Sequence, residues 1–194
     1  MPKRLVLCIT GASGAIYAKH FLETALDLDL KVDCIVSDNA KGVISYELGI
    51  PFEDFKSRFI PLGVRFHDAK NFFSPLASGS YLKRWVEAVV VLPCSVGTLG
   101  AVAGGVINNL IHRVCDAAIK EEVKLIMAIR EMPLNAIHLE NMLKLQRLGV
   151  KAFPISPAFY SKPKTLDELV NFTVGKIFDL LGIEHNLYKR WKGI

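Results

Sequence analysis

Residues 4–14 read Arg-Leu-Val-Leu-Cys-Ile-Thr-Gly-Ala-Ser-Gly, and this stretch decides the fold class. A short apolar run, 5–10, ends at Thr10 and gives way to a loop of small residues. A buried strand, a glycine loop and a following helix together point backbone N–H groups and a helix N-terminus outward, which makes a seat for a phosphate. Because a sharp strand-to-helix turn also needs glycine for steric reasons alone, a turn without a ligand stays an alternative.

Apolar, β-branched runs recur along the chain and alternate with stretches of helical periodicity. The expected strands are 5–10, 32–37, 88–94, 125–129 and 152–155, with a weaker run at 64–67, and the expected helices are 14–28, 38–48, 95–105, 108–121, 135–148 and 165–181. Near-continuous apolar strands are typical of a parallel sheet covered by helices on both faces. The pattern predicts an α/β, doubly wound, Rossmann-like fold with a mostly parallel sheet and three αβα layers.

The length of 194 residues fits a single domain, which we expect over 1–183, followed by a polar C-terminal tail over 184–194 that is free to dock on a neighbouring subunit. Hydrophobic residues make up 51% of the chain and the mean hydropathy is +0.31, which exceeds the values of an average soluble domain. This excess predicts burial between subunits, and therefore a homo-oligomer.

The net charge of +5 comes from 24 Lys and Arg against 19 Asp and Glu, spread along the chain without a basic block. This distribution favours small anionic ligands and argues against nucleic acid as a partner. The four cysteines form no CxxC pair, so we expect free thiols, no metal site and a reducing compartment. No apolar segment is long enough to span a bilayer, and the chain is predicted to be cytoplasmic.

Polar residues follow several expected strands, at the sheet edge where ligands of doubly wound folds bind. They are Gly11, Ala12 and Ser13 after the first strand, Ser37 after the second, the segment Ser95, Val96, Gly97 and Thr98 after the run 88–94, and Arg130 with Glu131 after the run 125–129. Hydroxyl groups, N–H groups and a fixed positive charge suit a phosphate. The alternative is that Ser95 only caps a helix and that Arg130 only pairs with Glu131 or another carboxylate.

Other reactive side chains carry weaker signals. Glu47, on the helix after the second strand, could act as an acid or base, although a lone helical Glu is more often a solvated residue. Cys94 has no His neighbour in sequence, so we interpret it as an inert buried thiol. His138 has no second His one turn away, which argues against zinc.

Seven ordered motifs resemble the UbiX-type flavin prenyltransferases over nearly all of 4–183. They are 10–14 (Thr-Gly-Ala-Ser-Gly), 77–80 (Ala-Ser-Gly-Ser), 93–99 (Pro-Cys-Ser-Val-Gly-Thr-Leu), 108–111 (Asn-Asn-Leu-Ile), 130–134 (Arg-Glu-Met-Pro-Leu), 137–143 (Ile-His-Leu-Glu-Asn-Met-Leu) and 157–160 (Pro-Ala-Phe-Tyr). The resemblance implies transfer of a dimethylallyl group from dimethylallyl monophosphate to reduced FMN, with new bonds to a flavin ring nitrogen and an adjacent ring carbon. It also implies that a partner UbiD-type decarboxylase receives the product, and that the enzyme is a large homo-oligomer, up to a dodecamer, with sites at subunit interfaces.

The resemblance assigns roles to individual residues. Gly11, Ala12, Ser13, Ser37, Ser95, Val96, Gly97, Thr98 and Arg130 match FMN-binding positions; Arg113, Lys120, Tyr160 and Lys176 match positions that hold the prenyl phosphate; Glu47 and Glu131 match acidic residues that handle protons; Trp191 matches a tail aromatic near the prenyl site. Ser13 and Tyr160 are further candidates for a direct part in the chemistry. Lys176 stands where some relatives carry Arg, and Phe72 where some carry Trp, which leaves open whether the donor is a monophosphate or a diphosphate.

Two other functions remain alternatives. One is an FMN-dependent decarboxylase of peptidyl or pantothenoyl cysteine, which shares the fold but carries a catalytic His and a different loop in place of 93–98. The other is a subunit that carries FMN for a decarboxylase without modifying it.

Overall fold

The computed structural model describes residues 4–191 and 193. In chain order its elements are β1 (Arg4–Ile9), α1 (Ala15–Asp27), β2 (Val32–Val36), α2 (Asp38–Leu48), α3 (Phe52–Phe59), β3 (Arg65–Asp68), α4 (Gly79–Trp85), β4 (Val86–Cys94), α5 (Val96–Gly104), α6 (Leu110–Lys120), β5 (Lys124–Ile129), α7 (Ala136–Arg147), β6 (Lys151–Pro154) and α8 (Leu166–Leu181). Short 3-10 turns lie at Ile60–Leu62 and Pro75–Ala77. Residues 1–3, 192 and 194, which fall in the predicted domain and tail, lie outside the described residues.

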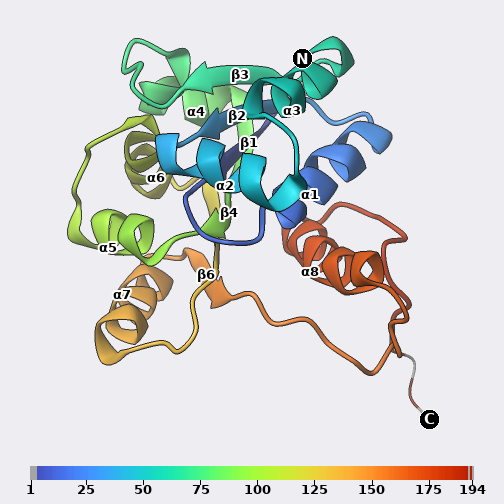
Figure 1. Ribbon diagram of the computed structural model, residues 1–194. Coiled ribbons are helices and arrows are strands. Elements are labelled where there is room, and N and C mark those ends of the chain that lie inside the picture. The colour runs from blue at the N-terminus through green and yellow to red at the C-terminus, as the bar shows by residue number, and fades with distance from the viewer. Residues whose placement is uncertain (1–3, 192, 194) are drawn as a thin grey trace.

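The six strands form one sheet in the order β3-β2-β1-β4-β5-β6. Every neighbouring pair is parallel, so the prediction of a mostly parallel sheet is confirmed in a stricter form. In this order the chain starts in the middle of the sheet, builds outward to β3, and returns to build outward to β6 (Figure 1). The order reverses between β1 and β4, and ligands of doubly wound folds bind at the carboxyl ends of the two strands that flank such a reversal.

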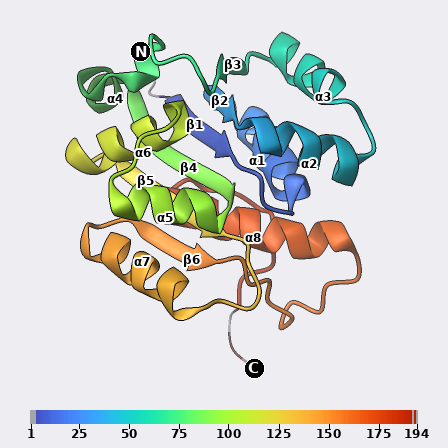
Figure 2. The same cartoon turned by 60° about the vertical axis from the view of Figure 1, so that its left-hand side comes forward.

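Two apolar cores lie on opposite faces of the sheet. Alternate residues of β1 point to opposite sides, so that Leu7 joins the core under α1, α2, α3 and α8, whereas Cys8 joins the core under α4, α5, α6 and α7. Figure 2 shows α1 and α8 together on one side of the sheet and α5 and α7 on the other. The predicted three-layer αβα arrangement is confirmed.

Two helices, α3 and α4, were not predicted from the sequence. Both are short, with eight and seven residues, and α3 buries only Phe55 and Phe59, one turn apart. So short an apolar stripe gives little periodic signal, because a helix of this length is stabilised by packing rather than by its own propensity. None of the helices among the described residues is long and apolar enough to cross a membrane.

A buried ionic cluster joins the three strands β1, β2 and β3. Asp33 of β2 is 1% exposed, and its carboxylate accepts hydrogen bonds from Arg4 Nε at 2.5 Å and pairs with His67 Nε2 at 2.9 Å. The other ring nitrogen of His67 lies 3.1 Å from the hydroxyl oxygen of Ser74. Burial alone would raise the pKa of Asp33, but the hydrogen bonds from His67 and Arg4 outweigh burial and lower this pKa.

Replacing Asp33 by Asn is expected to lower the free energy of unfolding by about 3 kcal/mol at neutral pH, because it leaves the Arg4 guanidinium buried without a counter-charge. The pKa of Asp33 is lowered in the folded state, so its contribution exists above the pKa of an unfolded Asp and is lost as the pH falls through the lower folded value. Urea unfolding at neutral and acidic pH measures both effects. The exposed Asp54→Asn on α3 is the control, and an Asp33→Asn variant as stable as this control would contradict the prediction.

Candidate functional site at the carboxyl ends of the strands

The loops that follow β1 and β4 are joined by one buried threonine. Thr10 is 2% exposed; its hydroxyl donates to the carbonyl of Pro93 at 2.8 Å and accepts the N–H of Ser95 at 2.7 Å. The backbone N–H of Thr10 also donates to the Pro93 carbonyl, at 3.2 Å. This residue therefore fixes the glycine loop 11–14 relative to the start of α5.

Gly11 is required by a close approach of two backbone segments. A Cβ atom added to Gly11 would lie 2.6 Å from the Cβ of Asn39, in the first turn of α2. Next to it Ala12 is buried, whereas Ser13 is exposed at the edge of the sheet. Ser37 caps α2, since its Oγ accepts the N–H of Ala40 at 3.3 Å. The structure thus brings the residues expected after β1 and β2 to one edge.

The N-terminus of α1 is already bound to a carboxylate. Glu47, in the last turn of α2, accepts the N–H of Gly14 at 2.8 Å and the N–H of Ala15 at 2.7 Å, both through Oε2. A negative side chain at the positive end of a helix is stabilising, and it would repel a phosphate. The structure therefore differs from the expectation that this glycine loop and helix start receive a phosphate.

The N-terminus of α5 is open instead. Ser95 caps this helix, because its Oγ accepts the N–H of Thr98 at 3.3 Å and donates to the Thr98 hydroxyl at 3.1 Å. Among the described residues the N–H groups of Val96 and Gly97 have no partner, as is usual for the first turn of a helix. Gly97 is exposed, and a Cβ there would meet nothing closer than Ser95 Oγ at 4.0 Å.

Arg130 lies next to this helix start with an unpaired charge. Its backbone N–H donates to the carbonyl of Cys94 at 3.0 Å, which aligns the end of β5 with the end of β4. Its exposed guanidinium has no ion-pair partner within residues 4–191 and 193, so the alternative of a structural ion pair is wrong for the chain as described. The carboxylate of Glu131 accepts the backbone N–H of Met132 at 3.1 Å.

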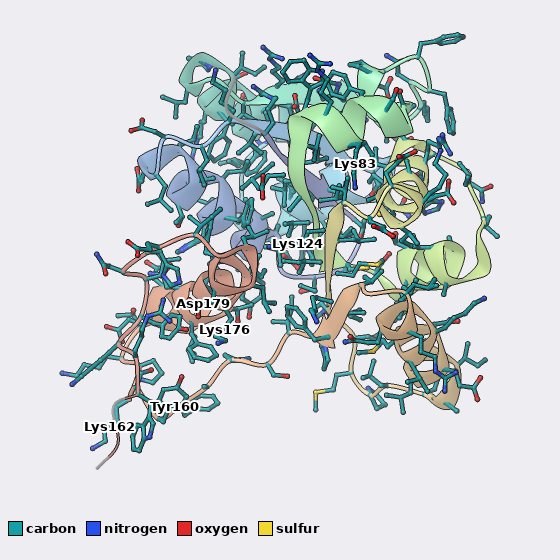
Figure 3. The ribbon with its side chains drawn as sticks, turned by 180° about the vertical axis from the view of Figure 1, so that it is seen from behind. Lys83, Lys124, Tyr160, Lys162, Lys176 and Asp179 are labelled. Atoms are coloured by element: carbon teal, nitrogen blue, oxygen red, sulfur yellow. The ribbon has the colours of Figure 1, made fainter. Side chains whose placement is uncertain are left out.

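The residues expected to hold the prenyl phosphate fall into two groups on opposite faces of the sheet. Arg113 and Lys120 lie on α6, where they pair with Asp116 at 2.8 Å and Glu121 at 3.0 Å. Lys176 lies on α8, on the other face. Figure 3 labels Lys176 and Asp179 on α8 and Tyr160 on the segment between β6 and α8. Within one chain the two groups do not form a single site.

Tyr160 and Trp191 are in contact beside α8. Their ring centroids lie 5.9 Å apart, and Tyr160 also contacts Phe172 of α8 at 5.8 Å. Residues 185–191 of the tail therefore pack against a helix of their own chain, and docking of the tail on a neighbouring subunit stays a prediction. The domain boundary at residue 183 stays a prediction.

The two weaker candidates have structural explanations. Burial raises the pKa of the Cys94 thiol well above its ordinary value, as expected for an inert thiol. The Nδ1 atom of His138 accepts the N–H of Asn135, whose side chain in turn accepts the His138 N–H at 3.0 Å, so this pair caps α7. Within residues 4–191 and 193, no three His, Cys, Asp or Glu side chains are grouped as a metal site would need.

Sequence reasoning missed Thr10, Asn39 and Asp179. Thr10 and Asn39 contact their partners across about 30 to 85 positions of sequence, and the Ser95–Thr10 hydrogen bond has a separation of 85 residues. Asp179 gave no signal of its own, because the sequence pattern of α8 is dominated by its apolar face. A hydroxyl at the last position of a strand is the one local signal that could have identified Thr10.

The strand order and the two joined loops define a doubly wound α/β protein with an open helix N-terminus at its switch point, where ligands of such folds bind. The family model described as Flavoprotein matches residues 1–178. The flavin prenyltransferase UbiX of Aquifex aeolicus is 50% identical over 191 residues, covering 98% of this chain and 100% of the relative.

Two solved structures extend the similarity to the whole fold. AnUbiX (PadA1), in complex with FMN and dimethylallyl pyrophosphate, matches with a TM-score of 0.93 at 32% identity, over 100% of both chains. A dodecameric FMN-dependent UbiX-like decarboxylase from Escherichia coli O157:H7 matches with a TM-score of 0.91 at 34% identity, over 98% of this chain and 100% of that one. This chain belongs to the flavoprotein family and, within it, to the flavin prenyltransferases of the UbiX type.

Proposed function

We propose that this enzyme transfers a dimethylallyl group from dimethylallyl monophosphate to reduced FMN and delivers the prenylated flavin to a UbiD-type decarboxylase. One observation carries the proposal: the α5 start with Arg130 is one cationic region, and the chain carries a second set of cations, Arg113 and Lys120 on α6 and Lys176 on α8, which would come together only between two copies of the chain. Binding FMN alone accounts for the first region only. The second fits another phosphate, which a carrier of FMN would not need.

The FMN phosphate is assigned to the α5 start. The N–H groups of Val96 and Gly97, the hydroxyls of Ser95 and Thr98, and the Arg130 guanidinium are donors that suit a phosphate. Gly11, Ala12, Ser13 and Ser37 form the opposite wall, which is too close to the backbone of α2 to carry larger side chains at Gly11. Reduced FMN supplies the nucleophilic ring atoms, and Ser13 lies at the exposed edge from which a flavin ring would be reached.

The second cationic set is assigned to the prenyl donor. When the carbon–oxygen bond of the donor breaks, the electron pair leaves with the phosphate, whose growing charge Arg113, Lys120, Lys176 and the Tyr160 hydroxyl would stabilise. The allyl cation needs a dry, aromatic surrounding, which Trp191 or the half-exposed Phe72 could supply. Because α6 and α8 lie on opposite faces, we propose that two copies of the chain complete each site, in a homo-oligomer.

The decisive test is the mass of the flavin. Purified protein incubated anaerobically with FMN, dimethylallyl monophosphate and a reductant should yield a flavin heavier by one prenyl unit, and an unchanged flavin mass would overturn the proposal. Repeating the incubation with dimethylallyl diphosphate decides the donor.

The four buried free cysteines support a reducing, cytoplasmic location.

Glu47 and Glu131 are proposed to handle protons at the flavin. Replacing Glu47 by Gln is expected to lower the rate of flavin prenylation about 100-fold, the usual contribution of one acid or base, while an amide oxygen can still accept an N–H of α1. Product formation is measured by the flavin mass, and folding by thermal unfolding. Glu53→Gln, exposed on α3, is the control. A Glu47→Gln enzyme with full activity would remove Glu47 from the mechanism.

A further inference from the structure

One carboxylate joins the C-terminal tail to α8. Asp179 of α8 accepts hydrogen bonds from Arg190 at 2.6 Å, from His185 Nε2 at 3.1 Å, from Lys176 at 3.4 Å, and from the hydroxyl of Tyr188. Three of these four donors belong to the segment 184–191, which we call the tail segment. The Asp179 side chain is only 18% exposed, because the tail segment covers it.

The helix surface beneath the tail segment is shaped for it. A Cβ atom on Gly175 would lie 2.6 Å from Cδ1 of Tyr188 and 2.8 Å from Cε1 of His185. The two rings therefore pack on bare helix backbone, which no other residue at position 175 would allow without moving them. Tyr188 also contacts Phe172, with ring centroids 5.0 Å apart, so the tail segment is seated along nearly two turns of α8.

This seating determines where Trp191 lies. The tail segment runs from His185 over α8 and ends with Trp191 against Tyr160. Lys176, one turn before Asp179 on α8, lies on the side of the helix that the tail segment covers. Asp179, a residue with no assigned role, thus bonds Lys176 directly and also bonds Arg190, the residue before Trp191, whose ring contacts Tyr160. Figure 3 labels Lys176 next to Asp179 on α8, with Tyr160 further toward the lower part of the view.

The charged side chains where the tail segment meets α8 fit an anionic ligand. Lys176 and Arg190 face the single carboxylate of Asp179, which leaves net positive charge beside Tyr160. Burial alone would raise the pKa of Asp179, but its hydrogen bonds from Arg190, Tyr188, His185 and Lys176 lower this pKa, so the carboxylate stays ionised at neutral pH.

We propose that Asp179 is a positioning residue that clasps the tail segment to α8, and that the clasped tail forms one wall of the prenyl-donor site without contributing to FMN binding. This inference rests on the proposed function and deepens it. Asp179 itself touches neither substrate; it acts by holding Lys176 and Trp191 in place. The donor and the flavin are therefore affected differently when the clasp is broken.

Two variants break the clasp by independent means. Asp179→Asn removes the charge that holds the cations, and Gly175→Ala pushes Tyr188 and His185 away while Asp179 is kept. Each is expected to raise the KM for dimethylallyl monophosphate about tenfold or more, the size of one lost charged hydrogen bond, and to leave the Kd for FMN unchanged. Asp179→Glu, which keeps the charge, is expected to restore part of the donor affinity. Asp167→Asn, exposed at the start of α8, is the matched control and should behave as the parent enzyme.

A second measurement does not depend on catalysis. Lys189 and Arg190 are trypsin sites within the tail segment, and the clasp should protect them. Trypsin is expected to cut the Asp179→Asn and Gly175→Ala variants there several times faster than the parent chain. If prenylation itself fails in the parent, the proposed function is wrong but the protection assay still tests the clasp. Equal cleavage of parent and variants, an unchanged donor KM, or an equal loss of FMN binding would each overturn the clasp.

Discussion

Replacement of Gly97 by Asp is expected to weaken FMN binding about 1,000-fold. The new carboxylate would occupy the open start of α5, as Glu47 occupies the start of α1, and would repel the flavin phosphate. Two unit charges about 4 Å apart interact by about 4 kcal/mol at an effective dielectric constant near 20, and every 1.4 kcal/mol is roughly tenfold in affinity. The side chain fits, because the nearest atom to a Cβ on Gly97 is Ser95 Oγ at 4.0 Å. Flavin fluorescence titration measures the Kd.

Two control variants separate charge from shape. Gly97→Ala adds a Cβ at the same position without charge and should bind FMN nearly as the parent does. Gly42→Asp adds the same carboxylate on α2, where nothing lies within 4 Å of a Cβ, and should also bind normally. An acidic residue in the first turn of a helix is stabilising, so a lower melting temperature is not expected for Gly97→Asp. Normal FMN affinity in this variant would contradict a phosphate seat at α5.

The sequence predicted the sheet because its strands carry their signal locally. Runs such as 88–94 and 125–129 are apolar throughout, as a strand covered on both faces requires, and the observed β4 and β5 fall on them within two residues. Ser95 and Arg130 were located for the same reason, since the end of an apolar run marks the sheet edge. Short elements such as α3 had no such signal.

The choice between two helix starts could not be predicted. The segments before α1 and α5 both contain small residues and hydroxyls, and both read as phosphate seats. What distinguishes them is Glu47, 33 residues away from Gly14 in sequence, which reaches the start of α1 only after β2 and α2 have packed. A contact of this kind depends on the tertiary fold and has no local pattern.

The division of the cationic residues between two faces was equally invisible in sequence. Arg113, Lys120 and Lys176 carry the same charge and look like one set. The set is divided because α6 packs on the face of Cys8 and α8 on the face of Leu7. The two groups are separated only because α6 and α8 cover different faces of the sheet, and this division supports the interfacial site that the family resemblance implies.

Subunit mixing tests the shared site and is expected to change activity from nearly none to a substantial fraction. Arg113→Ala and Lys176→Ala should each be almost inactive as pure oligomers, because each lacks one cation for the departing phosphate. In a mixture assembled at random from equal amounts, half of the sites receive an intact α6 and, independently, half receive an intact α8. About a quarter of the sites in such a symmetric oligomer are then complete, and the flavin mass assay should show about a quarter of the parent activity.

The matched control for mixing places both lesions on the same helix. This control is a mixture of the single variants Arg113→Ala and Lys120→Ala, in which every copy has a defective α6. No site becomes complete in it, so its activity should stay as low as that of each variant alone. Native mass spectrometry verifies that mixed oligomers formed in both experiments. If mixed oligomers of Arg113→Ala and Lys176→Ala regain no activity, then α6 and α8 of different copies do not share a site. Recovery in the first mixture and not in the second follows only if the two faces of the sheet meet across a subunit interface, because within one chain α6 and α8 remain separated by the sheet itself.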